Sequence, residues 1–465
     1  MYNRSINDTI CALSTPPGTG AIAVIRLSGP ASFEIIRGIF MPVEKNLEIL
    51  TAPSHTIHLG FIMNESAMVD EVLLSLFRSP HSYTGEDVIE ISCHGSGFIQ
   101  QQVLGILTTK GARLARPGEF TLRGFLNRKF DLSQAEAVAD LIAAHSQSSH
   151  DLAIKQMRGG FSKKIVRLRQ SLLDFTALIE LELDFSEEHM IFADRSDLHD
   201  LLEMIEKELT LLVSSFSLGN VIKLGIPVAI VGKPNVGKST LLNAILNEEK
   251  AIVSEIPGTT RDAIEDTIVI GGYSFRFIDT AGLRASEDQI ETMGIERTWE
   301  KINDATVILY VFDVTENSFS DVMEAVAEFK DTIKENNQRL ILIGNKTDKL
   351  NELPKGFKDF LDYQTIFVSG KRKENIHLIA DHLQQVVEDT KIPDNTIITN
   401  SRHYEALQHA LEAILNVRKG LQEGLSPDLL TIDIRQALFH LGNITGEITT
   451  DEVLGAIFSR FCVGK

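Results

Sequence analysis

The stretch VAIVGKPNVGKST, residues 228–240, decides how the rest of the chain is interpreted. An apolar run ends at Gly232, and after four residues the chain reads Gly-Lys-Ser, which is the spacing of a P-loop. The glycines let backbone N–H groups surround a polyanion, Lys238 can reach the β and γ phosphates, and the Ser239 hydroxyl can ligate Mg²⁺. A helical pattern follows and directs its positive end at the same phosphates. The sequence therefore predicts a nucleoside triphosphate site.

The motif NKTD, residues 345–348, selects the base. It ends a buried apolar strand, where the Asp348 carboxylate can accept both the ring N–H and the exocyclic amine of guanine. Adenine offers a different edge and would leave this acid unpaired. Residues 368–371 are placed to touch the base with backbone amides. GTP is therefore the expected nucleotide.

Two segments between these motifs are typical of a nucleotide switch. In DTAG, Asp279 would hold Mg²⁺ through water and Gly282 would sense the γ phosphate. In PGTTRD, Thr259 or Thr260 would complete the magnesium shell when the loop closes. Many small GTPases place a water-orienting glutamine where this chain has Leu283, so another group orients the water or hydrolysis is very slow. The candidates in the following loop are Arg284, Glu287, Asp288 and Glu291.

Length and composition indicate a multidomain globular protein. The 465 residues suggest about three domains, at a prior of ~150 residues each. No apolar run approaches the ~20 residues of a spanning helix and the N-terminus lacks a signal peptide, so we expect a cytoplasmic protein. Three scattered cysteines argue against a disulfide framework or a zinc site. A net charge of −19 argues against broad nucleic-acid coating but leaves room for one local basic patch.

The hydrophobic pattern divides the chain into four segments of a multidomain α/β and α+β fold. Residues 1–126 alternate β-rich runs with turns and predict an α+β domain. Residues 127–220 and 389–465 are helical and predict a discontinuous bundle. Residues 221–388 alternate apolar strands with helices, which predicts a mostly parallel sheet in a Ras-like P-loop GTPase domain inserted into the bundle.

Local patterns predict several helices of the bundle. Ser133 and Glu136 match a capping box that opens a helix over residues 133–157. After the glycine pair at 159–160, a lengthwise packing stripe recurs at three and four residue steps. That stripe consists of Ile165, Leu168, Leu172, Phe175 and Ile179. In the last segment the expected stripe is Tyr404, Leu407, Leu411 and Leu415.

Two charged residues interrupt apolar strand runs in the first segment. Arg26 closes the run AIAVIR, and Glu90 lies between two isoleucines. Such residues are either outward-facing members of an alternation or ligands in a pocket, and the pattern alone favours the outward-facing alternative.

Six segments together closely resemble the MnmE (TrmE) family of tRNA-modification GTPases. They are GKPNVGKST, PGTTRD, DTAGLR, NKTD, the block LARPGEFTLRGFLNRKFDLSQAEAVADLI and the terminal FCVGK. The match covers essentially the whole chain; the GTPase motifs are widely shared, whereas the RPGEF block and FCVGK are specific. The resemblance implies an N-terminal tetrahydrofolate-binding domain that forms a homodimer, a discontinuous helical domain and an inserted GTPase domain. It also implies an FAD-dependent partner, MnmG (GidA), in a heterotetrameric or larger complex that acts on tRNA without a membrane.

The resemblance further implies the reaction. The family adds a carboxymethylaminomethyl or aminomethyl group to C5 of the wobble uridine of certain tRNAs, with a one-carbon unit from 5-formyl- or methylene-tetrahydrofolate. K⁺ beside the β and γ phosphates would substitute for an arginine finger and let the GTPase domains dimerise. Glu291 matches the acid that orients water, which answers the question raised by Leu283. The folate site would comprise Arg26, Glu90, Lys129 and Lys465, and this resemblance overturns the outward-facing interpretation of the first two.

By the same resemblance, Mg²⁺ would be held by Ser239 and Thr260, and K⁺ by Asn235, Ser254, Ile256 and Thr259. The full GTP-binding set is Asn235, Val236, Gly237, Lys238, Ser239, Thr240, Ser254, Glu255, Ile256, Pro257, Gly258, Thr259, Thr260, Asp279, Thr280, Ala281, Gly282, Asn345, Lys346, Asp348, Ser369, Gly370 and Lys371.

One alternative function shares the GTPase motifs. A regulatory switch of the ribosome-assembly kind would act by nucleotide-dependent binding without tRNA chemistry. The RPGEF block, FCVGK and the absence of an appended GXXG RNA-binding motif favour the enzyme.

The chain departs from the family at residues 369–376, SGKRKENI, where the family more often has Ser-Ala and a glycine nearer the end.

Overall fold

The computed structural model of the protein describes residues 7–185, 195–248, 266–278, 302–328, 330–335, 338–350, 364–389, 397–459 and 461–464. Its contacts divide the chain into two units, each assembled from separated segments. The first comprises Met1–Ile142, Ile154–Leu209 and Glu405–Lys465, and the second comprises Ala143–Ala153 and Thr210–Tyr404. The sequence-based boundaries at 126, 220 and 388 stay predictions.

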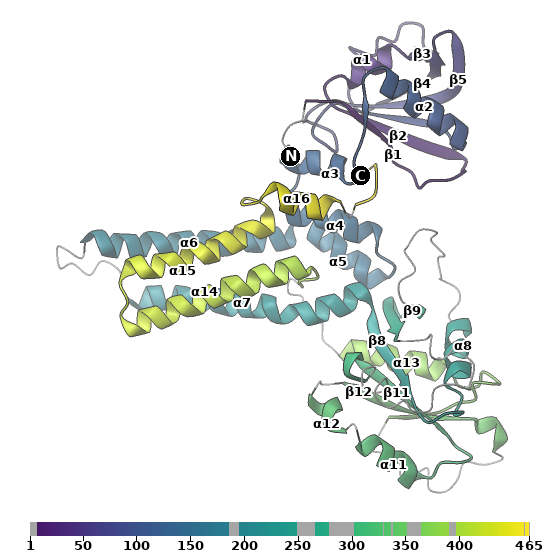
Figure 1. Ribbon diagram of the computed structural model, residues 1–465, viewed down its shortest axis with the longest axis vertical. Helices are drawn as coiled ribbons and strands as arrows, with labels where there is room; N and C mark the ends of the chain where they lie inside the picture. Colours follow the sequence, from purple (N-terminus) through teal and green to yellow (C-terminus); the bar gives the residue numbers. More distant parts are fainter. Residues whose placement is uncertain are drawn as a thin grey trace. The chain divides into compact units, whose positions relative to one another are not determined.

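A seven-stranded sheet forms the N-terminal part of the first unit (Figure 1). The strand order is β3-β4-β5-β6-β2-β1-β7, and all neighbours are antiparallel except β1 and β7. Side chains alternate between faces along a strand, so one face of β2 and β6 is apolar and lies under α1 and α2. The elements are β1 (Ile10–Leu13), β2 (Ile22–Ser28), α1 (Ser32–Arg37), β3 (Phe40–Pro42), β4 (Thr56–Asn64), β5 (Ala67–Phe77), β6 (Val88–His94), α2 (Gly97–Thr109), β7 (Arg113–Leu114) and α3 (Glu119–Leu126).

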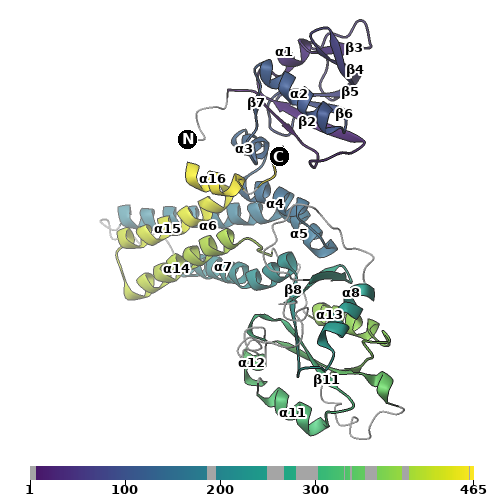
Figure 2. The ribbon, with the colours of Figure 1, turned by 45° about the vertical axis from the view of Figure 1, so that its right-hand side comes forward.

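Helices form the rest of the first unit, and α6 and α15 pack side by side (Figures 1 and 2). The predicted stripe of α6, from Ile165 to Ile179, is buried at every position, as lengthwise packing requires. None of the helices in the described part of the chain is long and apolar enough to cross a membrane. The helices are α4 (Leu132–Ile142), α5 (Gln147–Met157), α6 (Gly160–Phe185), α7 (Arg195–Leu224), α14 (Ser401–Glu423), α15 (Pro427–Thr445) and α16 (Asp451–Phe458); α5, α7 and α14 each belong partly to the second unit.

The predicted capping box at Ser133 and Glu136 is wrong by two residues. The Asp131 carboxylate accepts from the Gln134 backbone N–H, and the Gln134 side chain accepts from the Asp131 backbone N–H, each at 3.0 Å. This reciprocal pair closes the start of α4, because Asp and Gln serve these roles as well as Ser and Glu do. Ser133 instead bonds to Ser162 of α6 at 2.7 Å.

Two further helix predictions need correction. The predicted helix over residues 133–157 is two helices, because the Ser146 hydroxyl accepts from the Ser149 N–H at 3.2 Å and caps a new start at α5. The predicted stripe of α14 is out of phase with the buried face: Leu407 is buried, but Leu415 is 36% exposed and Ile414 is fully buried beside it. Alanines at 406, 410 and 413 share the buried face, which a search for large apolar residues misses.

A six-stranded sheet forms the centre of the second unit, in the order β13-β12-β11-β8-β10-β9. All neighbours are parallel except β9 and β10, and β9 is a strand that the sequence did not predict. Helices α8 and α13 cover one face and α11 the other, so the central strands are buried on both sides (Figure 2). The expected fold class is confirmed. The elements are β8 (Ile226–Val231), α8 (Lys238–Glu248), β9 (Asp266–Ile270), β10 (Tyr273–Phe277), β11 (Val307–Asp313), α11 (Phe319–Ala327), α12 (Lys330–Glu335), β12 (Arg339–Asn345), the 3-10 turn η4 (Thr347–Lys349), β13 (Thr365–Phe367) and α13 (His377–Asp389).

Candidate nucleotide and folate sites

The phosphate loop joins β8 to α8, and two glycines make its shape possible. Gly232 has a φ of 149°, and a Cβ there would lie 2.1 Å from the Val311 carbonyl oxygen. Gly237 has a φ of 94°, and a Cβ there would lie 2.4 Å from the Asn345 side-chain nitrogen. Neither position accepts a side chain without movement of the backbone. The loop therefore forms the close-fitting backbone cradle that a polyphosphate requires.

Asn345 connects this cradle to residues 369–370, in the loop after β13. Its amide nitrogen donates to the Val236 carbonyl at 2.9 Å, and its amide oxygen accepts from the Gly370 N–H at 3.0 Å. The side chain is 3% exposed, so both bonds form away from bulk water. One buried amide thus sets the position of the phosphate loop relative to the loop after β13.

Lys346 connects the phosphate loop to the end of β11. Its ammonium group donates to the Asn235 carbonyl and lies close to the Asp313 carboxylate, each at 2.6 Å. Burial raises the pKa of Asp313, but hydrogen bonds from Lys346 and Thr315 outweigh burial and hold the pKa below its usual value. Asn235 itself has a φ of 62°, a left-handed conformation that asparagine tolerates better than most residues.

Asp348 lies beside the segment that follows β13. Its carboxylate accepts from the Ser369 hydroxyl at 2.6 Å, and the same hydroxyl accepts from the Arg372 N–H at 3.1 Å. The hydrogen bond from Ser369 holds the pKa of Asp348 below its usual value. The acid is therefore ionised near neutral pH and can accept two N–H groups, as guanine requires.

Lys238 and Ser239 begin α8, next to the cradle. The Lys238 ammonium donates to the carbonyls of Gly232 and Lys233, each at 2.8 Å, so its side chain runs back across the loop. Ser239 is half-buried in the first turn of the helix and Thr240 is exposed. The structure thus brings together the predicted residues of the P-loop, NKTD and residues 369–370, while Lys371 is exposed beside them.

Several predicted residues lie outside the described part of the chain. They are Ser254, Glu255, Ile256, Pro257, Gly258, Thr259, Thr260, Asp279, Thr280, Ala281, Gly282, Glu291 and Lys465. Their proposed contacts with nucleotide, Mg²⁺, K⁺ and folate stay predictions.

Arg26 and Glu90 face each other on neighbouring strands of the N-terminal sheet. The register pairs them directly, and the Arg26 guanidinium donates to Glu90 Oε1 from Nε at 2.9 Å and from a terminal nitrogen at 2.7 Å. The guanidinium also lies 5.1 Å from the Tyr83 ring centre and 5.6 Å from that of Phe120. With exposures of 16% and 26%, the pair is half-buried beside aromatic rings rather than on an open surface.

The C-terminal tail lies next to the same strands. The Ser14 hydroxyl donates to the Gly464 carbonyl at 3.2 Å, and a Cβ on Gly464 would lie 2.1 Å from the Leu13 carbonyl oxygen. Residue 12 of this strand pairs with Arg26, so Gly464 contacts the strand next to the one that carries Arg26. Lys129 is exposed and donates to the Pro80 carbonyl at 2.8 Å. The structure therefore places the tail against the strand next to that of Arg26, while Lys129 has a separate partner.

The sequence did not identify the buried charges that hold this region together. Arg123 is 3% exposed and bonds to Asp8, Glu86 and Glu119. Burial raises the pKa of the Glu119 carboxyl, but hydrogen bonds from Arg113 and the Arg116 N–H outweigh burial and hold it below its usual value. The RPGEF block supplies Glu119 to this network and Phe120 to the surroundings of Arg26, so the block itself was the available signal.

Comparisons with known proteins agree with this architecture. Residues 9–129 match the family model for the GTP-binding protein TrmE N-terminus, and residues 132–462 match the model for the MnmE helical domain. A tRNA modification GTPase MnmE from Flavobacterium psychrophilum is 52% identical over 461 residues, which cover 99% of each chain. The MnmE proteins of Flavobacterium johnsoniae and Bacteroides fragilis are each 51% identical, over 98% of this chain and 99% of theirs. A family model that spans most of the chain and full-length identity at this level show that the chain belongs to the MnmE (TrmE) family of tRNA modification GTPases.

Proposed function

We propose that this GTP hydrolase works with an FAD-dependent MnmG-type partner to add an aminomethyl or carboxymethylaminomethyl group to C5 of the wobble uridine in certain tRNAs. The observation that supports the proposal is the close-fitting loop after β8, which the buried Asn345 side chain links to the loop after β13, in a chain that belongs to this family. The one-carbon unit would come from a tetrahydrofolate bound in the N-terminal domain.

In the proposed GTPase cycle, the cradle and Lys238 bind the phosphates and Asp348 accepts from guanine. Ser239 and Thr260 would hold Mg²⁺, which would neutralise charge on the β and γ phosphates. Ser239 fits this role because it lies half-buried at the start of α8, where the phosphates meet the helix. Glu291 would orient the attacking water, a task that Leu283 cannot perform.

We assign K⁺ to the outer side of the phosphate loop, with Asn235, Ser254, Ile256 and Thr259 as ligands. Lys346 already holds the Asn235 carbonyl, and the left-handed backbone there sets where the side chain starts. Asparagine suits the site because it offers an oxygen ligand and tolerates this conformation. K⁺ would place positive charge beside the β and γ phosphates when two GTPase domains meet.

The Arg26–Glu90 pair supports the folate proposal. Glu90 accepts from Arg26 through Oε1 alone, so its second oxygen can accept from the amino-bearing edge of a pterin. The rings of Tyr83 and Phe120 give an apolar boundary, and Lys129 and Lys465 would face the glutamate carboxylates of the folate.

The homodimer would form through the N-terminal domains. Several large apolar side chains of β4 and β5 are exposed there, and Leu59 and Leu73 are directly paired in the register at 44% and 46% exposure. Ile57 and Met68 extend this apolar surface, which a second copy of the domain would cover.

Asp348→Asn should reverse the preference for the base. The amide offers one donor and one acceptor, so it cannot accept both guanine N–H groups but matches xanthine, which has a carbonyl in place of the amine. GTP affinity should fall on the order of 100-fold or more, since two bonds to a charged group of about 1.5–3 kcal/mol each are lost. Fluorescent nucleotide titration should show that xanthosine triphosphate regains the lost affinity. Equal GTP binding by the variant would remove the guanine assignment.

GTP hydrolysis should be faster in K⁺ than in Na⁺ at equal ionic strength, on the order of 10-fold or more and below the ~10³–10⁵ of an arginine finger. Asn235→Gly should abolish this preference because it removes the oxygen ligand while glycine still adopts the φ of 62°. GTP affinity should change little, because the backbone carbonyl that binds Lys346 remains. A variant that keeps the full K⁺ preference would rule out the role of Asn235.

Arg26→Lys should weaken binding of 5-formyl-tetrahydrofolate on the order of 10-fold. Lysine keeps the positive charge but cannot form the two hydrogen bonds by which the guanidinium orients Glu90. Equilibrium dialysis with the full chain measures this affinity. Arg37→Lys is the matched control, since Arg37 pairs with Glu34 in the same domain and both of these side chains are exposed. Similar affinities for both variants would contradict a folate site at Arg26.

A further inference from the structure

A short segment of the helical domain has a charge opposite to that of the chain. Residues 152–173 contain six Lys and Arg residues and no Asp or Glu, although the whole chain has 64 acids and 45 bases. This segment covers most of α5 and the first half of α6. Such a local reversal is the electrostatic feature that a polyanion would bind.

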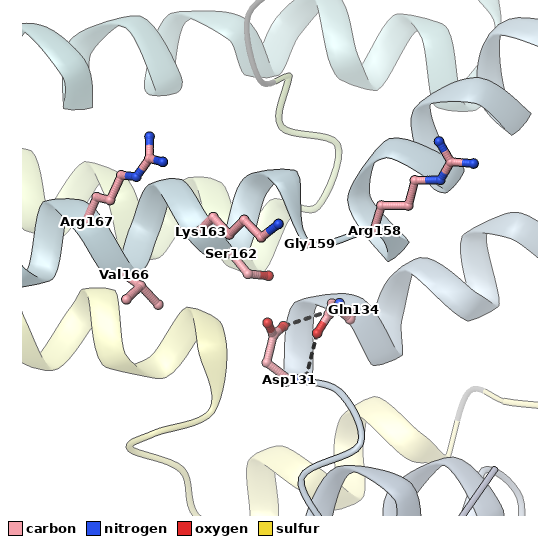
Figure 3. A pocket seen from close by; sticks show the side chains of 8 residues that line it. All are labelled: Asp131, Gln134, Arg158, Gly159, Ser162, Lys163, Val166 and Arg167. Atoms are coloured by element: carbon pink, nitrogen blue, oxygen red, sulfur yellow. Dashed lines mark hydrogen bonds between the residues drawn. The ribbon is translucent and has the colours of Figure 1, made fainter. Parts of the chain in front are cut away.

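The basic segment borders a cavity at the junction of α4, α5 and α6. The cavity has a volume of about 390 Å³ (Figure 3). Three lining side chains carry positive charge and one carries negative charge, while a serine hydroxyl and a glutamine amide add polar groups. The lining residues are Asp131, Gln134, Arg158, Gly159, Ser162, Lys163, Val166 and Arg167.

Among the described residues, the three cations of the cavity differ from two neighbouring bases in forming no ion pair with a carboxylate. Two other bases of the segment are paired, Lys164 with Glu208 at 3.7 Å and Arg169 with Glu447. In the part of the chain that the structure describes, no carboxylate forms an ion pair with the three lining cations Arg158, Lys163 and Arg167. Their charge is therefore uncompensated at the surface and available to an anion.

The single acid of the cavity is already engaged. The Asp131 carboxylate accepts from the Ser133 hydroxyl at 2.9 Å and from the Gln134 N–H at 3.0 Å, as part of the α4 cap. Figure 3 shows Asp131 and Gln134 bonded to each other on the side of the cavity that faces Ser162. Asp131 keeps its negative charge, but three cations against one acid leave the lining of the cavity net positive.

Hydrogen bonds hold the wall of the cavity in a fixed shape. The Gln134 amide donates to the Met157 carbonyl at 2.9 Å and so fixes the end of α5. Gly159 has a φ of 76°, and a Cβ there would lie 3.1 Å from the same amide, so glycine allows the close turn into α6. The Ser162 and Ser133 hydroxyls bond at 2.7 Å and tie α6 to α4. A wall built in this way costs little reorganisation when a ligand binds.

We propose that this cavity, with Arg158, Lys163 and Arg167, binds the phosphate backbone of an RNA. The proposal deepens the proposed function and rests on it only for the choice of RNA as the source of the phosphates. Lys163 and Arg167 lie one helical turn apart, about 6 Å along α6, so they can contact neighbouring phosphates of one strand. Arginine forms bidentate bonds to phosphate, and the helix start at Gly160 adds a favourable dipole. The contact would position tRNA without reading its sequence.

Binding of unmodified tRNA by the full chain tests the proposal, by fluorescence anisotropy across a series of KCl concentrations. The triple variant Arg158→Gln, Lys163→Gln, Arg167→Gln should bind on the order of 100-fold more weakly at 0.1 M salt, because a loss of about 2 from the slope of log K against log salt amounts to about two decades of affinity between 1 M and 0.1 M. The slope of log K against log salt should fall by about 2, since each lost phosphate contact removes roughly 0.7–0.9. The effect should be the same for tRNAs of different sequence.

The control is Lys45→Gln, Lys110→Gln, Arg435→Gln, which removes the same charge from exposed positions elsewhere in the first unit. The control should keep the wild-type affinity and slope, and both variants should keep the wild-type rate of GTP hydrolysis, which shows that they fold. Equal affinities for the two triple variants, or no tRNA binding by the wild-type chain, would overturn the proposal.

A second arm separates RNA from a small anion. If the cavity selects RNA, 5 mM inorganic phosphate at constant ionic strength should leave the tRNA affinity of the wild-type chain unchanged; displacement by phosphate would assign the cavity to a small anion and overturn the proposal. Failure of the proposed function has a different signature, because wobble modification would then be independent of this chain while the titrations still distinguish the two triple variants.

Discussion

The buried amide of Asn345 is the interaction on which the nucleotide site depends. It donates to the phosphate loop and accepts from the loop after β13, and it also occupies the space that a side chain at 237 would need. Parallel strands bring β8 and β12 to the same edge of the sheet, but they do not set the spacing of the loops that follow them. The Asn345 side chain sets this spacing, because it carries both a donor and an acceptor. Its burial makes both hydrogen bonds costly to break.

A second buried network organises the N-terminal domain in a similar way. Arg123 binds two acids from distant parts of the chain, Asp8 and Glu86, and also Glu119 one turn earlier in the same helix. The Glu119 carboxylate in turn accepts from the Arg116 N–H and fixes the turn there. The tail at 461–464 packs on this turn, since the Gly118 N–H donates to the Cys462 carbonyl at 3.4 Å. The family-specific RPGEF block and the C-terminal motif are therefore in contact, although more than 300 residues separate them.

Sequence reasoning succeeded where one physical signal dominated. Wholly apolar strands, the glycine spacing of the phosphate loop and the α6 stripe each reflect a single requirement, and the structure confirms them as elements. It failed where alternatives have nearly equal energy. Either Asp131 or Ser133 can cap a helix, and in the structure Asp131 caps α4 while the Ser133 hydroxyl bonds to Asp131 and to Ser162. The phase of α14 depends on alanines that gain little from burial individually, so large leucines misled the prediction.

The departures from the family pattern are also intelligible from the structure. Asn375 has a φ of 61°, a left-handed position that favours glycine and that asparagine tolerates. At Gly370 a Cβ would lie 3.4 Å from the Leu241 backbone, which is ordinary contact and accommodates an alanine. What the sequence could not supply were the partner of Arg26 and the surroundings of the cations at the α5–α6 junction, because both depend on which distant segments lie beside them.

The central claim is that a guanine nucleotide site held together by Asn345 drives modification of the tRNA wobble uridine. Mass spectrometry of tRNA nucleosides from cells that lack the chain, and from the same cells supplied with wild-type or Asn345→Asp protein, tests it most directly. Aspartate has the same shape but cannot donate to the Val236 carbonyl. We expect the C5-substituted uridine to be absent without the chain, restored by the wild-type protein and not restored by the variant. Unchanged modification in the cells that lack the chain would contradict the account.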